Sequence, residues 1–274
     1  GAGPVTPERR CVVLILDGLG DRPIPALGGR TPLEAARTPR LDRLAATGRC
    51  GLVDPVEEGR VPNTHTGVGV LFGLRAPQRR LLHRGPVEAA GAGLELKPGD
   101  IAFRANLATL ESRDGELFVV DRRAGRVTED APLFAEALAE LDLGEGVVAR
   151  FRSTDQHRGA LVLSGAGLSA ALGNTDPGDG VMPSPVLSCR PKHASATGTA
   201  ALVDRYVRLA HGILRDHPLN RGRLRAGKLQ VSGVITRGAG ASFELDGVLR
   251  ARGIPAALVV GCNTVAGLGR VFDL

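Results

Sequence analysis

Asp17 is the first residue of the sequence whose position predicts a role in binding a ligand. It ends an apolar, β-prone run at residues 12–16 and is followed by Gly18. Such a run predicts a buried strand of a parallel sheet, and open α/β sheets bind ligands beyond the carboxyl ends of such strands. The alternative is that Asp17 only caps the turn that follows. Asp17 is therefore a candidate site residue.

Thr64 is the second candidate, because a polar loop runs into an apolar helical segment within residues 61–73. This pattern predicts that Thr64 lies at or beside a helix N-terminus, where free N–H groups and the helix dipole favour an anion or an alkoxide. His65 adjoins it, at a place where a base could act, although a single histidine in a loop is more often solvated. The simpler interpretation makes Thr64 or Thr66 an ordinary N-cap.

The middle of the chain carries a dense set of basic side chains that could bind an anion. Arginine grips phosphate and carboxylate groups through two parallel hydrogen bonds. The candidates for binding a substrate are Arg104, Arg122, Arg123, Arg126, His157 and Arg158. The alternative is a solvated basic face, which is the commoner place for any single arginine.

The basic charge of the chain favours small anionic ligands. The formal net charge is +6, and lysine appears only as Lys97, Lys192 and Lys228, so that arginine supplies nearly all of it. Aromatic residues make up 3% of the chain and tryptophan is absent, which leaves little material for stacking on bases. We therefore expect no nucleic-acid partner.

The cysteines and the apolar runs favour a cytoplasmic protein. Cys11, Cys50, Cys189 and Cys262 are scattered without a metal-ligand spacing, so we expect free thiols in a reducing compartment. No apolar run approaches the roughly 18 residues of a membrane span. Residues 1–10 have the composition of a flexible tail rather than that of a signal peptide.

The two ends of the chain carry the pattern of a parallel sheet. Helix starts at Thr31-Pro32 and Thr38-Pro39 are followed by a short strand at residues 50–53, in β-α-β order. Near the C-terminus we expect strands at residues 231–236 and 256–260, helices at residues 240–252 and up to Leu268, and a further strand from Val271. The chain ends within this pattern.

The composition changes between about Arg75 and Arg225. Residues 117–120 and 160–163 have the pattern of strands, and residues 132–141 and 200–215 that of amphipathic helices. We therefore predict a discontinuous α/β core of residues 1–75 and 229–274, with residues 76–228 inserted as a smaller α+β domain.

Ten segments between residues 14 and 240 resemble, in order and spacing, the archaeal-type cofactor-independent phosphoglycerate mutases of the alkaline phosphatase superfamily. They include LILDGLGDRP at 14–23, RGPVEAAGAGLEL at 84–96, DIAFRANLATL at 100–110 and HRGALVL at 157–163. The resemblance extends over almost the whole chain.

The resemblance implies an alkaline-phosphatase-like doubly wound core, here C-terminally shortened, with an inserted domain that grips the substrate. It also implies two divalent metal ions, manganese or zinc, with Asp17 as a metal ligand. The nucleophile segment of the family aligns with residues 64–68. Thr64 then replaces the serine that becomes phosphorylated, and Val68 replaces a histidine. Threonine keeps a hydroxyl, whereas the loss of the histidine predicts a changed substrate or a lost mutase reaction.

The other metal ligands of the family have no counterpart in this sequence, although a two-metal site needs several carboxylates and imidazoles. We expect a diverged transferase that moves a phosphoryl or phosphonyl group on or to a small phosphorylated carboxylate such as phosphoglycerate, with phosphonate metabolism as one setting. The alternatives are a non-catalytic anion-binding protein and one half of a split or truncated mutase. A second copy or a complementing chain would then cover the exposed sheet edge.

Overall fold

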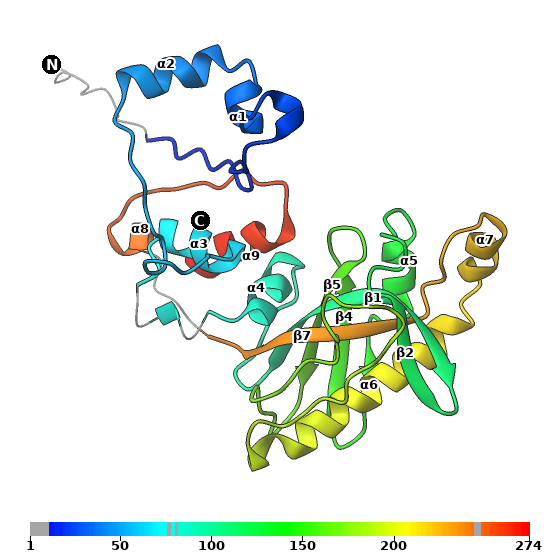
Figure 1. Cartoon of the computed structure of the whole chain (residues 1–274). Helices are drawn as coiled ribbons and strands as arrows, with labels where there is room; N and C mark the ends of the chain where they lie inside the picture. The colour runs from blue at the N-terminus through cyan, green and yellow to red at the C-terminus, as the bar shows by residue number, and fades with distance from the viewer. Residues whose placement is uncertain (1–10, 76–77, 80–81, 244–247) are drawn as a thin grey trace, which may run out of the picture. The chain divides into compact units, whose positions relative to one another are not determined.

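The computed structural model of the protein describes residues 11–75, 78–79, 82–243 and 248–274 (Figure 1). It divides into two compact units, one up to Asp54 and one from Pro55 onward, and each is described by itself. The residues expected to form a flexible tail, 1–10, lie outside the described part. Within that part no helix is long and apolar enough to cross a membrane. The four cysteines are free thiols, as predicted.

The N-terminal unit contains the two helices that its capping residues predict. A short 3-10 helix, η1 (Pro25–Leu27), precedes α1 (Pro32–Ala35) and α2 (Pro39–Thr47). Thr31 and Glu34 form a capping box, in which the Glu34 N–H donates to Thr31 Oγ1 at 3.2 Å and the Thr31 N–H to Glu34 Oε2 at 2.8 Å. The helix α2 ends at Gly48.

Three of the predicted strands, at residues 12–16, 50–53 and 256–260, are not present in the described part of the structure, so these predictions are wrong. Residues 12–16, 50–53 and 256–260 belong to no strand, and Val12 and Val259 are 87% and 99% exposed. Their composition suits a buried strand, but a strand exists only where a neighbour accepts and donates its hydrogen bonds. No described segment pairs with these three, so the parallel sheet is not formed in this part of the chain.

The second unit is built on an antiparallel sheet in the order β3-β4-β5-β1-β2-β6, with β7 paired to β1 (Figure 1). Its long central strand, β1 (Ile101–Arg113), pairs with β5 on one side, with β7 on the other, and with β2 in its second half. The other strands are β2 (Glu116–Asp121), β3 (Leu141–Asp142), β4 (Val148–Ser153), β5 (Arg158–Ser164), β6 (Ser184–Pro185) and β7 (Gly233–Ala241).

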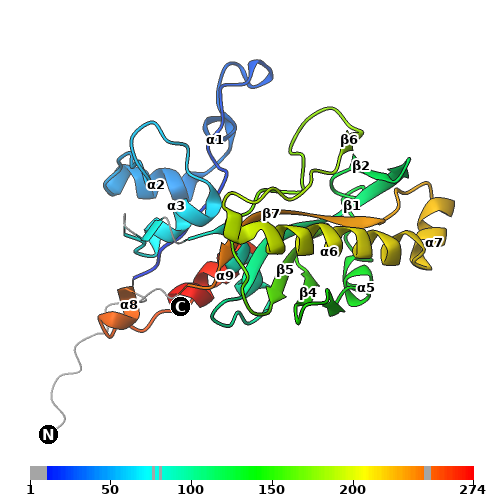
Figure 2. The same cartoon turned by 90° about the horizontal axis from the view of Figure 1, so that it is seen from below.

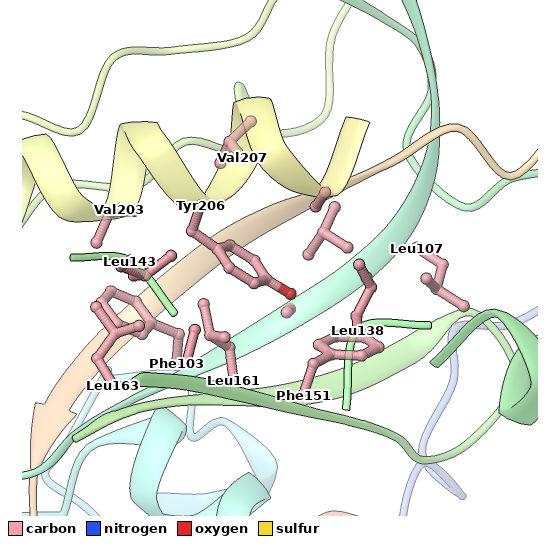
Figure 3. Packing of buried hydrophobic residues seen from close by; sticks show 14 of the residues in the cluster. Phe103, Leu107, Leu138, Leu143, Phe151, Leu161, Leu163, Val203, Tyr206 and Val207 are labelled. Carbon is pink, nitrogen blue, oxygen red and sulfur yellow. The ribbon is translucent and has the colours of Figure 1, made fainter. Parts of the chain in front are cut away.

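One face of this sheet packs on the long helix α6 (Thr197–Arg215) and the shorter α5 (Ala131–Glu136) to form the main core. Alternate residues of β1, among them Phe103 and Leu107, meet Tyr206 of α6 there (Figure 3). Tyr206, Phe103 and Phe151 are among the largest fully buried side chains. Burial of each such side chain contributes about 1.5–3 kcal/mol.

At one end of the opposite face, α4 (Arg84–Gly91) packs on Ala102, Ala160 and Val162. The helix comes very close to the strand, since a Cβ added to Gly85 would lie 2.0 Å from the carbonyl oxygen of Ala102. Toward the other end of β1, a second buried cluster consists of Ala108, Leu110, Val119 and Ile235. The middle of this face, beyond the end of α4, carries polar side chains.

The remaining helices are α3 (Thr64–Leu71), α7 (Leu219–Arg225), α8 (Val248–Ala251), α9 (Asn263–Phe272) and the 3-10 helix η3 (Ala194–Ala196). Helix α9 lies against α4, and α6 runs along the sheet beside β7 (Figure 2). The strand expected from Val271 is wrong, because α9 continues to Phe272. Leu268 and Phe272 are four residues apart and both are buried, which is a helical spacing.

Within the sheet, the strands at 117–120 and 160–163 and the helix at 200–215 are confirmed as β2, β5 and α6. The helix expected at 132–141 is shorter, because the chain turns into β3. Strand β7 includes residues 233–236 of the expected strand but continues to Ala241. The helix expected at 240–252 therefore does not begin at residue 240. Residues 244–247 of that expected helix lie outside the described residues. The domain division at 76–228 stays a prediction, although β7 belongs to the same sheet as β1.

Candidate anion-binding site

The pairing of β1 with its neighbours brings basic side chains together on the sheet face that α4 leaves open. Because Phe103 and Leu107 point into the core, Arg104 and Asn106 point to the opposite face. Arg104 stands directly opposite Arg237 of β7, and Asn106 directly opposite Arg158 of β5. Three arginines from three strands thus share one face.

These side chains line a pocket of about 240 Å³. Its walls consist of Arg104, Asn106, Arg122, Arg123, Arg126, Gln156, His157, Arg158, Asp179 and Arg237. All six residues that the sequence suggests for substrate binding lie in this set, although their roles stay predictions. The sequence analysis missed Arg237, Asn106, Gln156 and Asp179. The alternation of apolar and polar residues in 101–107 could have indicated Asn106, whereas Arg237 depends on the register of β7.

The loop after β2 presents Arg122, Arg123 and Arg126 to this pocket. The carboxylate of Asp121 accepts hydrogen bonds from the N–H groups of Arg123 at 2.7 Å and of Gly125 at 3.2 Å, which fixes the turn. Arg126 has a φ of 56°, a left-handed conformation that costs free energy in a residue with a side chain. The surrounding contacts therefore hold this loop in one shape.

Arg122 and Arg237 of the pocket both pair with a carboxylate, but Arg237 does so only loosely, since its Nε lies 4.0 Å from Asp176 Oδ2. Arg122 is held much more tightly. Its Nε and Nη2 donate to the two carboxylate oxygens of Asp176 at 2.6 and 2.7 Å, and its Nη1 pairs with Asp179. The hydrogen bonds that Arg122 donates to Asp176 raise the pKa of Arg122. Burial is the largest influence on the pKa of Asp176 and raises it, but the hydrogen bonds from Arg122 and from the Gly178 N–H, together with the charges of Arg122 and Arg237, make the net shift downward. Asp176 is buried, whereas Asp179 is 88% exposed.

Replacing Asp179 with asparagine is expected to tighten the binding of inorganic phosphate about three- to tenfold. The change removes a negative charge from the pocket wall and frees one nitrogen of Arg122, which Asp176 still holds in place. Titration calorimetry on the variant and on Asp216→Asn, an equally simple change at an exposed ion pair, measures the effect. Unchanged or weaker phosphate binding in Asp179→Asn would show that this carboxylate does not face the bound anion.

Arg104 is a cation that a bound anion would stabilise. Burial, and then the charges of Arg84 and Arg237, lower its pKa to about 10, and its Nε is buried without a hydrogen-bond partner. It is still charged at pH 7, so a cation with an unmet donor is held near other cations. A bound anion would satisfy that donor and relieve the repulsion.

His157 is neutral at pH 7. Burial, and then the charges of Arg158 and Arg123, lower its pKa to about 4. Its Nδ1 is buried and has no hydrogen-bond partner. A neutral imidazole in the wall of the pocket can pair with a hydroxyl or an anionic oxygen of a ligand without adding charge.

The low pKa of His157 predicts that acid destabilises the protein. In the unfolded chain the imidazole titrates near its ordinary value of 6.5, whereas the folded pKa is about 4. Between these values the unfolded chain binds a proton that the folded one does not, so the free energy of unfolding is fully present above pH 6.5 and falls toward pH 4. Urea unfolding at several pH values should show a shallower loss for His157→Gln than for the wild type. An equally steep loss in both proteins would contradict the assignment.

Thr64 and His65 begin α3 beside this region and do not line the pocket. Asn63 caps the helix, since its side chain accepts a hydrogen bond from the Thr66 N–H at 3.2 Å. The interpretation of Thr64 or Thr66 as the cap is therefore wrong, and Thr64 is the first residue of the helix. Burial, and then the charge of Arg84, lower the pKa of His65 to about 4, and its Nδ1 is buried without a partner. The charge of Arg104 contributes to the same shift.

Asp17 lies in the N-terminal unit, exposed, in a turn with Gly18. A metal site that includes Asp17 would need further His, Cys, Asp or Glu side chains close to it. In residues 11–75, 78–79, 82–243 and 248–274 there is no group of three or more His, Cys, Asp or Glu side chains that could hold an ion. The described residues therefore do not fit a manganese or zinc ion. The role of Asp17 stays a prediction.

Residues 45–220 match the model of the 2,3-bisphosphoglycerate-independent phosphoglycerate mutases. The chain belongs to this family. The match includes α3 and the pocket residues from Arg104 to Asp179, while Asp17 and Arg237 lie outside it. The resemblance read from the sequence is thereby confirmed.

Individual relatives agree with the assignment to the phosphoglycerate mutase family. The mutases of Methanopyrus kandleri and Ignicoccus hospitalis are 43% and 42% identical over 97% of this chain. The cofactor-independent phosphoglycerate mutase from Thermoplasma acidophilum DSM 1728 is 37% identical, with a TM-score of 0.60 over 95% of this chain and 67% of its own. The chain spans 63% and 64% of the length of the first two relatives.

Proposed function

We propose that the pocket binds a small phosphorylated carboxylate such as phosphoglycerate. The observation that carries the proposal is the gathering of Arg104, Arg158 and Arg237 from three strands, with Arg123 and Arg126 from the loop after β2, around one pocket. Such an acid has two anionic groups, and arginines on more than one wall suit both. Membership of the phosphoglycerate mutase family supports the same substrate class.

The reaction that we propose is a phosphoryl transfer of the mutase type through Thr64. The bond from Thr64 Oγ1 to phosphorus forms while the bond from phosphorus to the ester oxygen of the substrate breaks. The leaving oxygen takes up a proton, and the hydroxyl proton of Thr64 moves to a base. His65 is neutral at pH 7, so it is able to accept a proton, but a pKa of about 4 makes it a weak base. In the same way, Thr64 could pass the phosphoryl group to a carboxylic acid that carries a phosphonate group.

The pocket arginines would supply electrostatic stabilisation in this reaction. Phosphoryl transfer depends mainly on positioning and on cations placed around the transferring group. No carboxylate in the described part of the chain forms an ion pair with Arg104, which is therefore available to a transferring phosphoryl group or to the carboxylate of the substrate. Return of the phosphoryl group to the other hydroxyl of the same acid would complete the isomerisation.

A second candidate is that this chain binds the anion but completes the reaction only with a complementing chain or a second copy. The observation in its favour is the exposure of apolar, β-prone side chains in segments that have no strand partner among the described residues, such as Val12, Leu52 and Val259. Unpaired extended segments of this composition invite pairing with another chain. The divalent metal of the family would then have its ligands outside the described residues. A purely anion-binding protein would show the same pocket.

One experiment separates these functions. Titration calorimetry with 3-phosphoglycerate measures binding, and phosphorus NMR with manganese present follows conversion to 2-phosphoglycerate. The intact mass of the protein reports a transferred phosphoryl group, which Thr64→Val should abolish without loss of binding. Conversion supports the first function, and binding without conversion supports the second. No binding of phosphoglycerate would overturn both.

A further inference from the structure

A buried carboxylate stands next to the pocket without lining it. Glu88, in the second turn of α4, is 2% exposed. Its Oε1 accepts hydrogen bonds from Arg84 Nε at 2.7 Å and from Thr264 Oγ1 at 2.9 Å, and its Oε2 accepts one from Asn263 Nδ2 at 2.7 Å. Arg84 Nη2 also donates to Thr264 Oγ1 at 2.9 Å. The guanidinium of Arg84 is thus held at two of its nitrogens.

The start of α4 packs directly on the strands that carry the pocket. A Cβ added to Gly238 would lie 3.1 Å from the Cβ of Arg84, so Arg84 rests on β7 at the residue next to Arg237. Arg237 stands opposite Arg104 in the register of β1 and β7. Arg84, Arg104 and Arg237 therefore start from neighbouring positions on one face of the sheet.

Cations placed so close together repel one another, and an unrestrained arginine would turn toward water. Arg84 is only 20% exposed, and its charge lowers the pKa values of Arg104, His65 and Arg237. Its charge therefore acts at the pocket rather than in solvent. Glu88 and Thr264 are the groups that keep it there.

We propose that Arg84 and Glu88 form a positioning pair for the anion site. Glu88 holds the guanidinium of Arg84 beside the Arg104 end of the pocket, so that the positive charge of Arg84 attracts a bound phosphoryl or carboxylate group without touching it. The inference rests on the proposed function, since it presumes that the pocket binds such an anion. Arg84 does not line the pocket and acts on it through its charge and through Arg104 and Arg237.

The same network reaches the other wall of the pocket. Asn263 and Thr264 begin α9, and the N–H of Asn263 donates to Asp155 Oδ2 at 3.0 Å. Asp155 precedes Gln156 and His157, which line the pocket. The N-terminus of α9 therefore connects the turn that carries His157 with the helix that carries Arg84 and Glu88.

The direction in which Glu88→Gln changes the affinity for the anion shows whether Glu88 acts by positioning Arg84 or only by its negative charge. Glu88→Gln removes a negative charge near the pocket, and Coulomb attraction alone would tighten anion binding. An amide, however, offers one acceptor oxygen and a donor NH₂ group to a site where three donors converge, so Arg84 loses its anchor. We expect the dissociation constant for 3-phosphoglycerate to rise about tenfold. Arg84→Lys, which keeps the charge but lacks the planar fork, should weaken binding in the same direction.

Titration calorimetry on the full chain tests this, with Glu111→Gln as the matched control because Glu111 pairs with Arg113 on the exposed end of β1. Thermal unfolding shows whether each variant is folded. Thr264→Val, which removes a single hydroxyl, replaces Glu88→Gln if that variant does not fold, and a severalfold weaker binding is expected. NMR titration of His65 gives an independent readout: its pKa should rise in Arg84→Met and rise by a smaller amount in Arg84→Lys.

The outcomes separate this inference from the proposed function. If the wild type does not bind 3-phosphoglycerate, the proposed function fails. If the wild type binds it and Arg104→Ala does not, while the folded Glu88→Gln and Arg84→Lys variants bind as well as the wild type or better, the positioning pair is overturned. An unchanged pKa of His65 in Arg84→Met would also overturn it, because the charge of Arg84 would then not act at the site.

Discussion

Replacing Arg104 with alanine is expected to weaken the binding of 3-phosphoglycerate about 100-fold, because charge-assisted hydrogen bonds to a half-buried cation are worth a few kcal/mol. Arg104 lies in the centre of the pocket face, between β5 and β7. Its Nε is buried and has no hydrogen-bond partner among the described residues, so this donor is available to a ligand. Titration calorimetry measures the loss.

The same change should not destabilise the fold. Arg104 is held near Arg84 and Arg237, and burial together with these charges lowers its pKa to about 10. Removing it relieves repulsion and an unsatisfied donor, so the free energy of unfolding should stay unchanged or rise. Arg215→Ala, at an exposed ion pair on the last turn of α6, is the control and should change neither quantity. Wild-type affinity in Arg104→Ala would remove the central argument for this pocket as an anion site.

The pocket could be predicted in part from the sequence because residue type carries its chemistry. Arg104, Arg122, Arg123, Arg126, His157 and Arg158 were selected as a dense basic set, and the fold brings them together. Arg237 was missed, since it joins the set only through the pairing of β7 with β1 across more than a hundred residues. No local pattern reports such a pairing.

Strand β7 also shows why the sheet type was predicted wrongly. Val234 lies in the core under α6, whereas Ile235 is buried with Ala108 and Leu110 on the other face. A strand buried on both faces is a continuous apolar run, which is also the pattern of a strand in a parallel sheet. Here the run belongs to an antiparallel sheet, because connections rather than composition decide strand direction.

Three other strand predictions were wrong for a different reason, namely those at residues 12–16, 50–53 and 256–260. Their composition favours strands, and their flanking helices α1, α2 and α9 are present. Helices are stabilised by hydrogen bonds within the segment and by local caps such as Thr31, so they form where the sequence predicts them. A strand needs a neighbour, and the described residues supply none to these segments.

Replacing Arg223 with methionine is expected to lower the free energy of unfolding by about 2–3 kcal/mol, because it breaks a partly buried ion pair and two further hydrogen bonds of a buried guanidinium. The side chain of Arg223 on α7 is 7% exposed, and it donates to Asp130 Oδ2 at 2.8 Å, to the Leu229 carbonyl at 2.9 Å and to the Ala124 carbonyl at 3.3 Å. Methionine fills much of the volume but leaves all three acceptors without this donor.

The change should also weaken the binding of 3-phosphoglycerate about tenfold in the folded protein, since an anion site held in place by fewer contacts must be ordered on binding. Ala124 lies in the loop that presents Arg122, Arg123 and Arg126, so the hydrogen bond from Arg223 fixes the position of these guanidinium groups relative to the sheet. Urea unfolding measures the first effect and calorimetry the second.

Two further variants decide whether this explanation is right. Arg221→Met changes an exposed arginine of the same helix and should cost less than about 0.5 kcal/mol. Adding Asp130→Asn to Arg223→Met should recover part of the stability, because no carboxylate then remains without its cation, but should not recover the affinity, because the Ala124 carbonyl still lacks its donor. If the affinity returned together with the stability, the loop would depend on the charge of Asp130 and not on the hydrogen bond to Ala124.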